Sequence, residues 1–298
     1  MVLLQISKSV TCLVAGISFI SSASAIPVEM TQAVSQRSSS GAKRILLWPW
    51  KNTNEIETNT CPALKTTAST LAGSGSFRMV SNWETWHPDE FPKSLPFSPQ
   101  LATPDHYGGE RWNQLQDSIS WQQGAIVQSL NEPDLAGVSA ANAASLWSQL
   151  VQLRKSHGVK LVSPACTSDP ASKSWLSDFM GRVGGDGKPD YIGLHYYTSA
   201  SNPCDQEIAY AQSYIKEQYT TYNIPVIISE ISSTSRSEED AKKFVEAMAS
   251  WMDKQDYIFA YGFTGASRES ADEFSSPAAQ LLDTTGGLTE LGKWLAGL

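Results

Sequence analysis

Short apolar segments and longer amphipathic stretches alternate from residue 45 to the C-terminus, and this alternation constrains the fold more than any other feature. Such alternation favours a parallel sheet whose crossover connections are helices. Eight strand candidates within about 250 residues fit a closed (β/α)8 TIM barrel. We therefore predict an α/β barrel over residues 45–298, with strands at 45–49, 77–81, 95–101, 125–130, 159–164, 191–195, 225–229 and 257–263.

Most of the intervening stretches have helical periodicity. One helix, over 139–157, places Trp147 and Leu150 on one face and stops at Gly158. Another, over 237–254, begins with Ser237 and Asp240 in a capping pattern. Residues 82–94 have no such pattern and contain two prolines, so we expect a loop in place of the second crossover helix. The remaining helices are predicted over 62–72, 110–121, 172–183, 206–222 and 288–295.

The N-terminal segment is typical of a secretory signal. A lysine, Lys8, is the only charged residue before Glu29, an apolar stretch follows it, and Ala23-Ser24-Ala25 fits the cleavage pattern. We expect residues 1–25 to be the signal peptide and residues 26–44, which are rich in Ser and Gln, to be a disordered pro-segment or linker. The protein should therefore be secreted, to the extracellular space or the cell wall.

Charge excludes some classes of partner. The net charge is -8 with a pI near 5.1, and no run of basic residues occurs, so nucleic acid is not expected as a partner. No second long apolar run occurs, which gives no indication of a membrane span. We expect a monomer.

Polar and aromatic residues follow several of the predicted strands. Catalytic residues of such barrels lie at the carboxyl ends of the strands, so these side chains should share one face. Two are glutamates, Glu132 and Glu230, on strands that can face each other across the barrel mouth. The other candidates are Trp48, Trp50, Trp83, Asn131, His195 and Tyr197.

Two facing carboxylates suit glycosidic cleavage, since one can protonate the leaving oxygen while the other stays ionised. Other roles stay open at this point. Glu132 could be a carboxylate at a helix N-terminus, and Glu230 a structural ion-pair partner. The ring of His195 could bind sugar or lie in the core, and Tyr197 could bond Glu230 or only pack. The histidines have no metal-ligand spacing, so neither a metal nor another cofactor is predicted.

The order of these motifs resembles glycoside hydrolase family 128 of clan A, the fungal and bacterial endo-β-1,3-glucanases. The resemblance rests on Asn131-Glu132-Pro133-Asp134, on His195-Tyr196-Tyr197 and on Ile228-Ser229-Glu230, together with the tryptophans near residues 48–50 and 83. It implies a retaining mechanism with Glu132 as acid/base and Glu230 as nucleophile. It also implies a β-glucan polysaccharide or oligosaccharide as the substrate.

The last strand departs from that family. It reads Tyr261-Gly262-Phe263-Thr264 where the family usually has Tyr-Ala-Trp-Phe, so we expect Phe263 to replace a tryptophan as the sugar platform. This change supports a second hypothesis, a glucan-binding or wall-associated protein with little turnover. A third is a clan relative that acts on β-1,4-mannan or β-1,6-glucan. Reducing ends released from the three polymers would discriminate among the hypotheses.

Three cysteines remain after the signal segment. Cys166 and Cys204 lie in loops after neighbouring predicted strands, so we predict a disulfide between them, with Cys61 unpaired. Spacing alone does not fix the connectivity, and a pair that includes Cys61 is the alternative.

Overall fold

The computed structural model describes residues 42–270 and 274–298. The predicted signal peptide, residues 1–25, and most of the predicted linker lie outside the described residues. Three linker residues belong to the folded body: Ala42 is buried, Lys43 donates to the carbonyl of Gln255 at 2.7 Å, and Arg44 begins the first strand. In the described part of the chain, no helix is long and apolar enough to cross a membrane.

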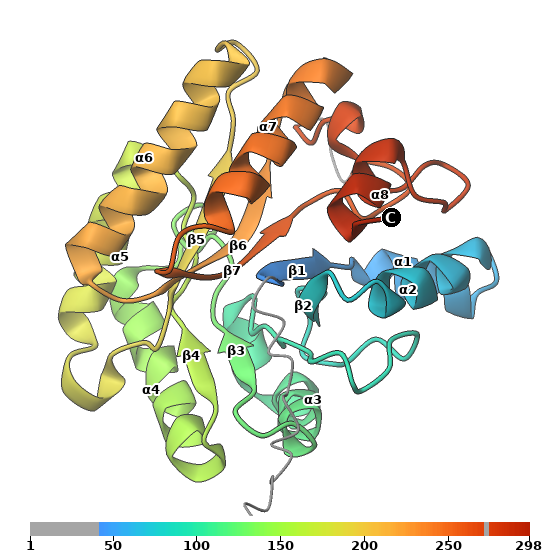
Figure 1. Ribbon diagram of the computed structural model, residues 1–298. Coiled ribbons are helices and arrows are strands. Elements are labelled where there is room, and N and C mark those ends of the chain that lie inside the picture. Colours follow the sequence, from blue (N-terminus) through green and yellow to red (C-terminus); the bar gives the residue numbers. More distant parts are fainter. Residues whose placement is uncertain (1–41, 271–273) are drawn as a thin grey trace, which may run out of the picture. The chain divides into compact units, whose positions relative to one another are not determined.

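The strands are all parallel (Figure 1). Five form one sheet in the order β2-β1-β7-β6-β5, and β3 and β4 form a second. Isolated bridges connect the two sheets on both sides. Val162 pairs with Tyr191 on one side, and the segment 97–100 pairs with β2 and β3 on the other. The strands are β1 Arg44–Leu47, β2 Phe77–Ser81, β3 Ile126–Gln128, β4 Lys160–Val162, β5 Ile192–Tyr197, β6 Val226–Ser232 and β7 Ile258–Phe263.

The predicted third strand, 95–101, forms only these bridges, at Phe97 and Gln100. This stretch contains two prolines, Pro96 and Pro99. Proline has no backbone N–H and therefore cannot donate a hydrogen bond to a β-ladder. Residues 82–94 contain turns and bends rather than a helix. Seven of the predicted strands are therefore present, and the eighth position of the ring is occupied by an irregular segment.

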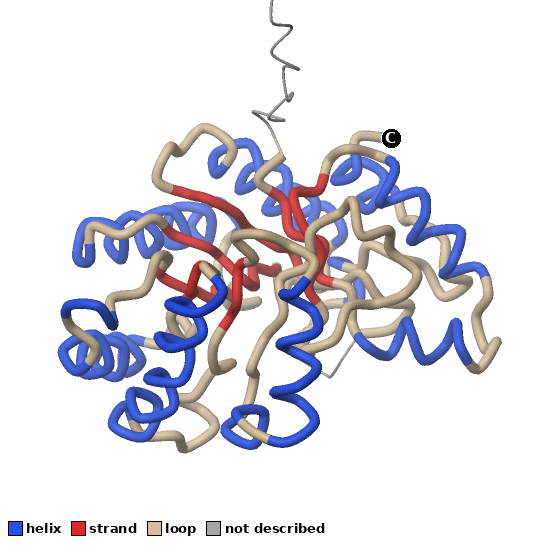
Figure 2. Tube along the Cα trace, turned by 90° about the horizontal axis from the view of Figure 1, so that it is seen from below, coloured by secondary structure: helices blue, strands red, loops and turns tan. Residues whose placement is uncertain are grey.

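Helices surround the strands (Figure 2). Their ends follow local chemistry: the Ser237 hydroxyl accepts the N–H of Asp240, and Gly158 ends a helix at φ 66°. Helix α1 was not predicted, because its polar sequence has little apolar periodicity. The helices are α1 Trp50–Glu57, α2 Ala63–Gly73, α3 Gly109–Ser120, α4 Ala140–His157, α5 Pro170–Arg182, α6 Cys204–Tyr222, α7 Glu238–Met252 and α8 Glu290–Ala296, with short 3-10 turns η1 Pro104–Tyr107, η2 Gly185–Gly187 and η3 Pro277–Ala279.

The core has two parts. The larger one lies between strands and helices and includes Trp147 and Leu150, the apolar face predicted for α4. The smaller one takes its side chains from five different strands: Ile45, Leu47, Met79, Val162, Ile227 and Ala260. A cluster shared by so many parallel strands is typical of the interior of an α/β barrel. A side chain at Gly193 would place its Cβ 2.7 Å from the Ser163 carbonyl oxygen, so only glycine fits there.

Candidate active site

Two neighbouring strands place Glu230 beside His195. The register of β5 and β6 pairs these residues directly, and both pairings of β6 are irregular near this point. One shift lies between Leu194 and His195 and the other between Ile228 and Ile231. Such bulges redirect side chains at strand ends and are common at active sites. Here they aim a glutamate and a histidine from two almost entirely buried strands toward the same point.

Two neutral donors hold the Glu230 carboxylate. The Trp83 indole Nε1 donates to Oε1 at 2.6 Å, and the Tyr197 hydroxyl donates to Oε2 at 2.6 Å. The side chain is only 9% exposed. Burial, and then the charge of Glu230, raise the pKa of Tyr197 far above its ordinary value, so its hydroxyl remains a donor. Because each carboxylate oxygen accepts a short bond, the ionised form of Glu230 is stabilised.

Glu132 lies in a loop beyond β3 rather than in a strand. Its φ is 39°, an uncommon value for a residue other than glycine, and its N–H donates to the Ala165 carbonyl at 2.8 Å. The N–H groups of Leu135 and Ala136 both donate to its carbonyl at 3.0 Å. In the described chain the other non-glycine residues with positive φ are Asn59, Asn223 and Trp83. Asparagine tolerates this conformation, so the two costly cases, Trp83 and Glu132, both belong to this site.

His195 joins the two glutamates. Its Nδ1 lies 2.9 Å from Glu132 Oε1 and its Nε2 lies 3.4 Å from Glu230 Oε1. The ring is fully buried. Burial lowers the pKa of His195, but Glu230 and Glu132 outweigh it and raise the pKa above its ordinary value. Of the roles left open for His195, the structure favours the core position, where the ring contacts both carboxylates.

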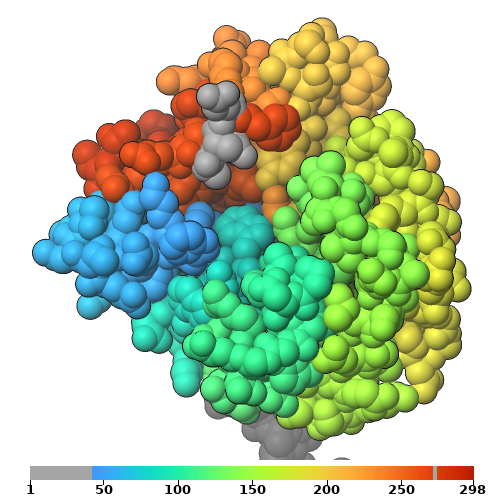
Figure 3. Space-filling model, turned by 180° about the vertical axis from the view of Figure 1, so that it is seen from behind, coloured from blue at the N-terminus to red at the C-terminus, as the bar shows by residue number. Residues whose placement is uncertain are grey.

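A cavity of about 820 Å³ opens above these groups. Segments from the N-terminal, middle and C-terminal parts of the chain meet around a central hollow on the face shown in Figure 3. The closest oxygens of Glu132 and Glu230 lie within 4.8 Å of each other. Six of the predicted site residues line the cavity: Trp50, Trp83, Asn131, Glu132, Tyr197 and Glu230.

Comparisons with known proteins agree with this arrangement. A family model described as the glycosyl hydrolase catalytic core matches residues 60–295. A solved structure of a family 128 (subgroup VI) exo-β-1,3-glucanase from Aureobasidium namibiae has 33% sequence identity and a TM-score of 0.75. That similarity covers 86% of this chain and 96% of the other. The chain belongs to glycoside hydrolase family 128.

Other solved structures of family 128 have the same fold. An endo-β-1,3-glucanase (subgroup IV) from Lentinula edodes is 25% identical with a TM-score of 0.67, covering 85% of this chain and 99% of that one. A subgroup I endo-β-1,3-glucanase variant from Amycolatopsis mediterranei, in complex with laminarihexaose, is 22% identical with a TM-score of 0.62. That similarity covers 77% of this chain and 94% of the other. No curated protein matches the chain.

Two residues predicted to bind substrate in this family 128 hydrolase lie in the core instead. Trp48 is fully buried, with its indole N–H bonded to Glu90 at 2.6 Å and its ring against Phe91. Phe263 is buried against Tyr261. Neither lines the cavity, so both predictions were wrong. Adjacent residues along a strand face opposite sides, and the sequence alone did not fix which side these two face.

The structure also adds residues to the cavity of the family 128 hydrolase that sequence reasoning missed. Exposed Leu135 and Phe274 lie at the cavity, and Phe274 also packs against Tyr197 with ring centroids 5.4 Å apart. The only sequence feature that could have indicated this role is that Phe274 is a lone phenylalanine in a Ser-rich stretch. The other additions are Ser232 at the end of β6, Ala279 in η3, and the loop residues Pro49, Thr167, Ser168, Asp169, Thr264, Gly265, Ser267, Ser275, Ser276 and Gln280.

The predicted disulfide is absent, because Cys61, Cys166 and Cys204 are all free thiols. Cys166 is buried beside the Asp134 carboxylate, and burial strongly raises the pKa of its thiol. Cys204 begins α6, and its thiol donates to the Asp240 carbonyl of α7 at 3.4 Å. The two thiols therefore face different neighbours. Adjacency of the two loops did not determine the directions of their side chains.

Glu132, His195 and Glu230 each offer one atom that could ligate a cation, all within 4.8 Å of one another. Both Glu230 oxygens already accept strong bonds from Trp83 and Tyr197. These two donors leave neither oxygen of the Glu230 carboxylate without a hydrogen bond in this family 128 hydrolase. The carboxylate therefore does not require a metal ion as a partner.

Proposed function

We propose that this family 128 hydrolase is a retaining β-1,3-glucanase, with Glu230 as nucleophile and Glu132 as acid/base. The observation that carries the proposal is the separation of the two carboxylates, whose closest oxygens lie within 4.8 Å. Inverting enzymes need a gap of about 6.5–9.5 Å to admit a water molecule between the carboxyl groups, and retaining enzymes need about 5–5.5 Å. The gap here leaves room for direct attack.

The first step forms a bond between Glu230 and the anomeric carbon while Glu132 donates its proton to the departing glycosidic oxygen. Glu132 then removes a proton from water, which attacks the same carbon and releases Glu230. The environments fit these roles. The Glu230 carboxylate has two neutral donors that stabilise its charge, whereas Glu132 faces the cavity with a side chain that is 24% exposed.

Product analysis on a linear β-1,3-glucan tests the proposal, with proton NMR recording the anomer that appears first. We expect the β-anomer, and we expect Glu132→Gln and Glu230→Gln each to reduce turnover by orders of magnitude. Initial release of the α-anomer, or wild-type release of reducing ends by either variant, would exclude the retaining assignment. Binding without release of sugar would instead support the glucan-binding hypothesis.

Exo action is a second candidate beside the endo action predicted from sequence. It is favoured by the 33% identity to an exo-β-1,3-glucanase. Exo action releases glucose or one short product from the first turnover, and endo action releases a range of oligosaccharides. Hydrolysis of β-1,4-mannan or β-1,6-glucan at a rate comparable to that of β-1,3-glucan would contradict both the exo and the endo candidate.

The remaining proposals concern architecture and location. The eight parallel segments form the (β/α)8 barrel of the family, and the loop at 82–94 replaces its second crossover helix. The protein is secreted to the extracellular space or the cell wall after cleavage behind Ala25. N-terminal sequencing of the protein from culture medium would test this, and a mature chain that starts at Met1 would contradict it.

A further inference from the structure

Helix α1 and the long connection after β7 form adjoining walls of the cavity. Helix α1 contributes Trp50, its half-exposed first residue. The connection contributes eight cavity residues between 264 and 280, among them the exposed Phe274. Apart from the short turn η3, the described part of this connection has no regular secondary structure. Its position must therefore be set by contacts with neighbouring elements.

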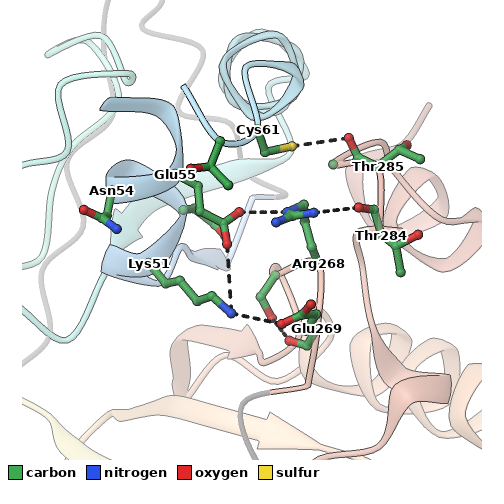
Figure 4. Close-up of polar contacts among 12 residues, drawn as sticks. Lys51, Asn54, Glu55, Cys61, Arg268, Glu269, Thr284 and Thr285 are labelled. Carbon is green, nitrogen blue, oxygen red and sulfur yellow. Dashed lines mark hydrogen bonds and ion pairs between the residues drawn. The ribbon is translucent and has the colours of Figure 1, made fainter. Parts of the chain in front are cut away.

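A polar network attaches this connection to α1 (Figure 4). The Arg268 Nε donates to Glu55 Oε2 at 2.7 Å, and its Nη1 donates to the Thr284 carbonyl at 2.8 Å. Lys51 lies one helical turn before Glu55 and donates to Glu269 Oε2 at 3.1 Å. Beside them, the buried Asn52 amide donates to the Ala266 carbonyl at 2.7 Å.

Burial makes one pair in this network stronger than an ordinary surface ion pair. The side chains of Glu55 and Arg268 are 9% and 21% exposed. Removing one partner of such a pair leaves a poorly solvated charge and forces the neighbouring structure to adjust. By contrast, Glu290 and Lys293 form a pair whose side chains are 86% and 49% exposed, and such pairs contribute little.

We propose that Glu55 and Arg268 are positioning residues that fix the distance between Trp50 and the wall formed by residues 264–270 and 274–280, and thereby determine how tightly the cavity binds a glucan chain. The inference rests on the proposed function. A tryptophan ring binds a sugar by its flat face, so a sugar unit next to Trp50 needs the adjoining wall at a defined distance. Both residues act at a distance from the reacting groups, so they should affect binding more than chemistry.

The test measures hydrolysis of a linear β-1,3-glucan hexasaccharide by Glu55→Gln, Arg268→Gln and the double variant. We expect KM to rise about five- to tenfold, the equivalent of losing one modest interaction, while kcat stays within about twofold. The double variant should be no worse than either single variant, since both remove the same interaction. The Kd of the hexasaccharide, measured in the inactive Glu230→Gln background, should rise by the same factor.

Two further variants separate positioning from a general loss of stability. Arg268→Lys keeps the charge and should restore part of the affinity, and Lys293→Gln, at the exposed pair, should leave KM unchanged. A wild-type KM and Kd in both single variants would overturn the inference, as would equal losses in KM and kcat with a lowered melting temperature. If Glu55→Gln does not fold, the two Arg268 variants still decide. Failure of the wild-type enzyme to bind or cleave the hexasaccharide would instead refute the proposed function.

Discussion

Glu230 and Glu132 share one cavity, but different parts of the fold hold them. Glu230 lies within β6, surrounded by buried neighbours, and donors from Trp83 and Tyr197 fix both of its oxygens. Glu132 lies in a loop at positive φ, and its side chain contacts only His195 among the bonds described. A carboxylate that must stay ionised benefits from rigid donors. One that must exchange protons with a leaving group and with water needs access to the cavity.

The largest effects should come from removing the two carboxylates. Glu230→Gln should reduce kcat by roughly 10⁴- to 10⁶-fold, the scale of losing a covalent nucleophile. Glu132→Gln should cost roughly 10²- to 10⁴-fold on glucan. With an aryl β-glucan-oligosaccharide that has an acidic leaving group, Glu132→Gln should recover its first step, because that group needs no proton. Steady-state and burst kinetics check this.

The substitution Glu207→Gln serves as the matched control, because the buried Glu207 carboxylate accepts a hydrogen bond from the Tyr196 hydroxyl outside the cavity. Equal losses for Glu132→Gln and Glu230→Gln on both kinds of substrate would break the proposed division of roles.

The donors to Glu230 should have the next largest effect. We expect Tyr197→Phe to lower kcat by about 10- to 100-fold, the scale of one bond to a charged group. Tyr196→Phe is the control on the same strand, since its hydroxyl bonds Glu207. An unchanged kcat in Tyr197→Phe would show that this donor does not support the nucleophile.

His195 should make stability depend on pH. Its pKa in the folded protein is raised above the ordinary 6.5. The stabilisation is therefore complete below that value and is lost as the pH rises through the higher folded pKa. Urea unfolding of wild type and His195→Gln at several pH values measures this. The difference in unfolding free energy should shrink as the pH rises, and a constant or growing difference would contradict a charged link between the glutamates.

The loop around Glu132 should show the smallest effect. Asp134, in this loop, accepts hydrogen bonds from Thr167 in the loop after β4 and from Ser172 in α5. Ser172→Ala should lower the unfolding free energy by about 1 kcal/mol, with kcat within about twofold. Ser174→Ala, on the same helix but exposed, is the control. A large loss of kcat in Ser172→Ala would mean that this loop positions Glu132 more rigidly than its single side-chain contact suggests.

The sequence by itself determined the elements and the location of the chemistry. Apolar alternation predicted eight strands, of which seven are present in the described residues, and most of the helices, because periodicity reports which residues are buried. Strand ends followed by Glu132, Glu230, Asn131 and Tyr197 predicted residues that do line one cavity, since parallel strands deliver their carboxyl ends to one face.

Only the tertiary structure decided which way individual side chains point. Trp48 faces the core and Trp50 faces the cavity, although only Pro49 separates them, because β1 has ended at Leu47 and α1 begins at Trp50. Cys166 and Cys204 follow neighbouring strands, but Cys166 lies beside Asp134 and Cys204 contacts Asp240 of α7. The connection at 264–280 has no periodicity, and its contacts with α1 come from residues more than 200 positions away. Such contacts depend on packing between distant segments, which no local pattern encodes.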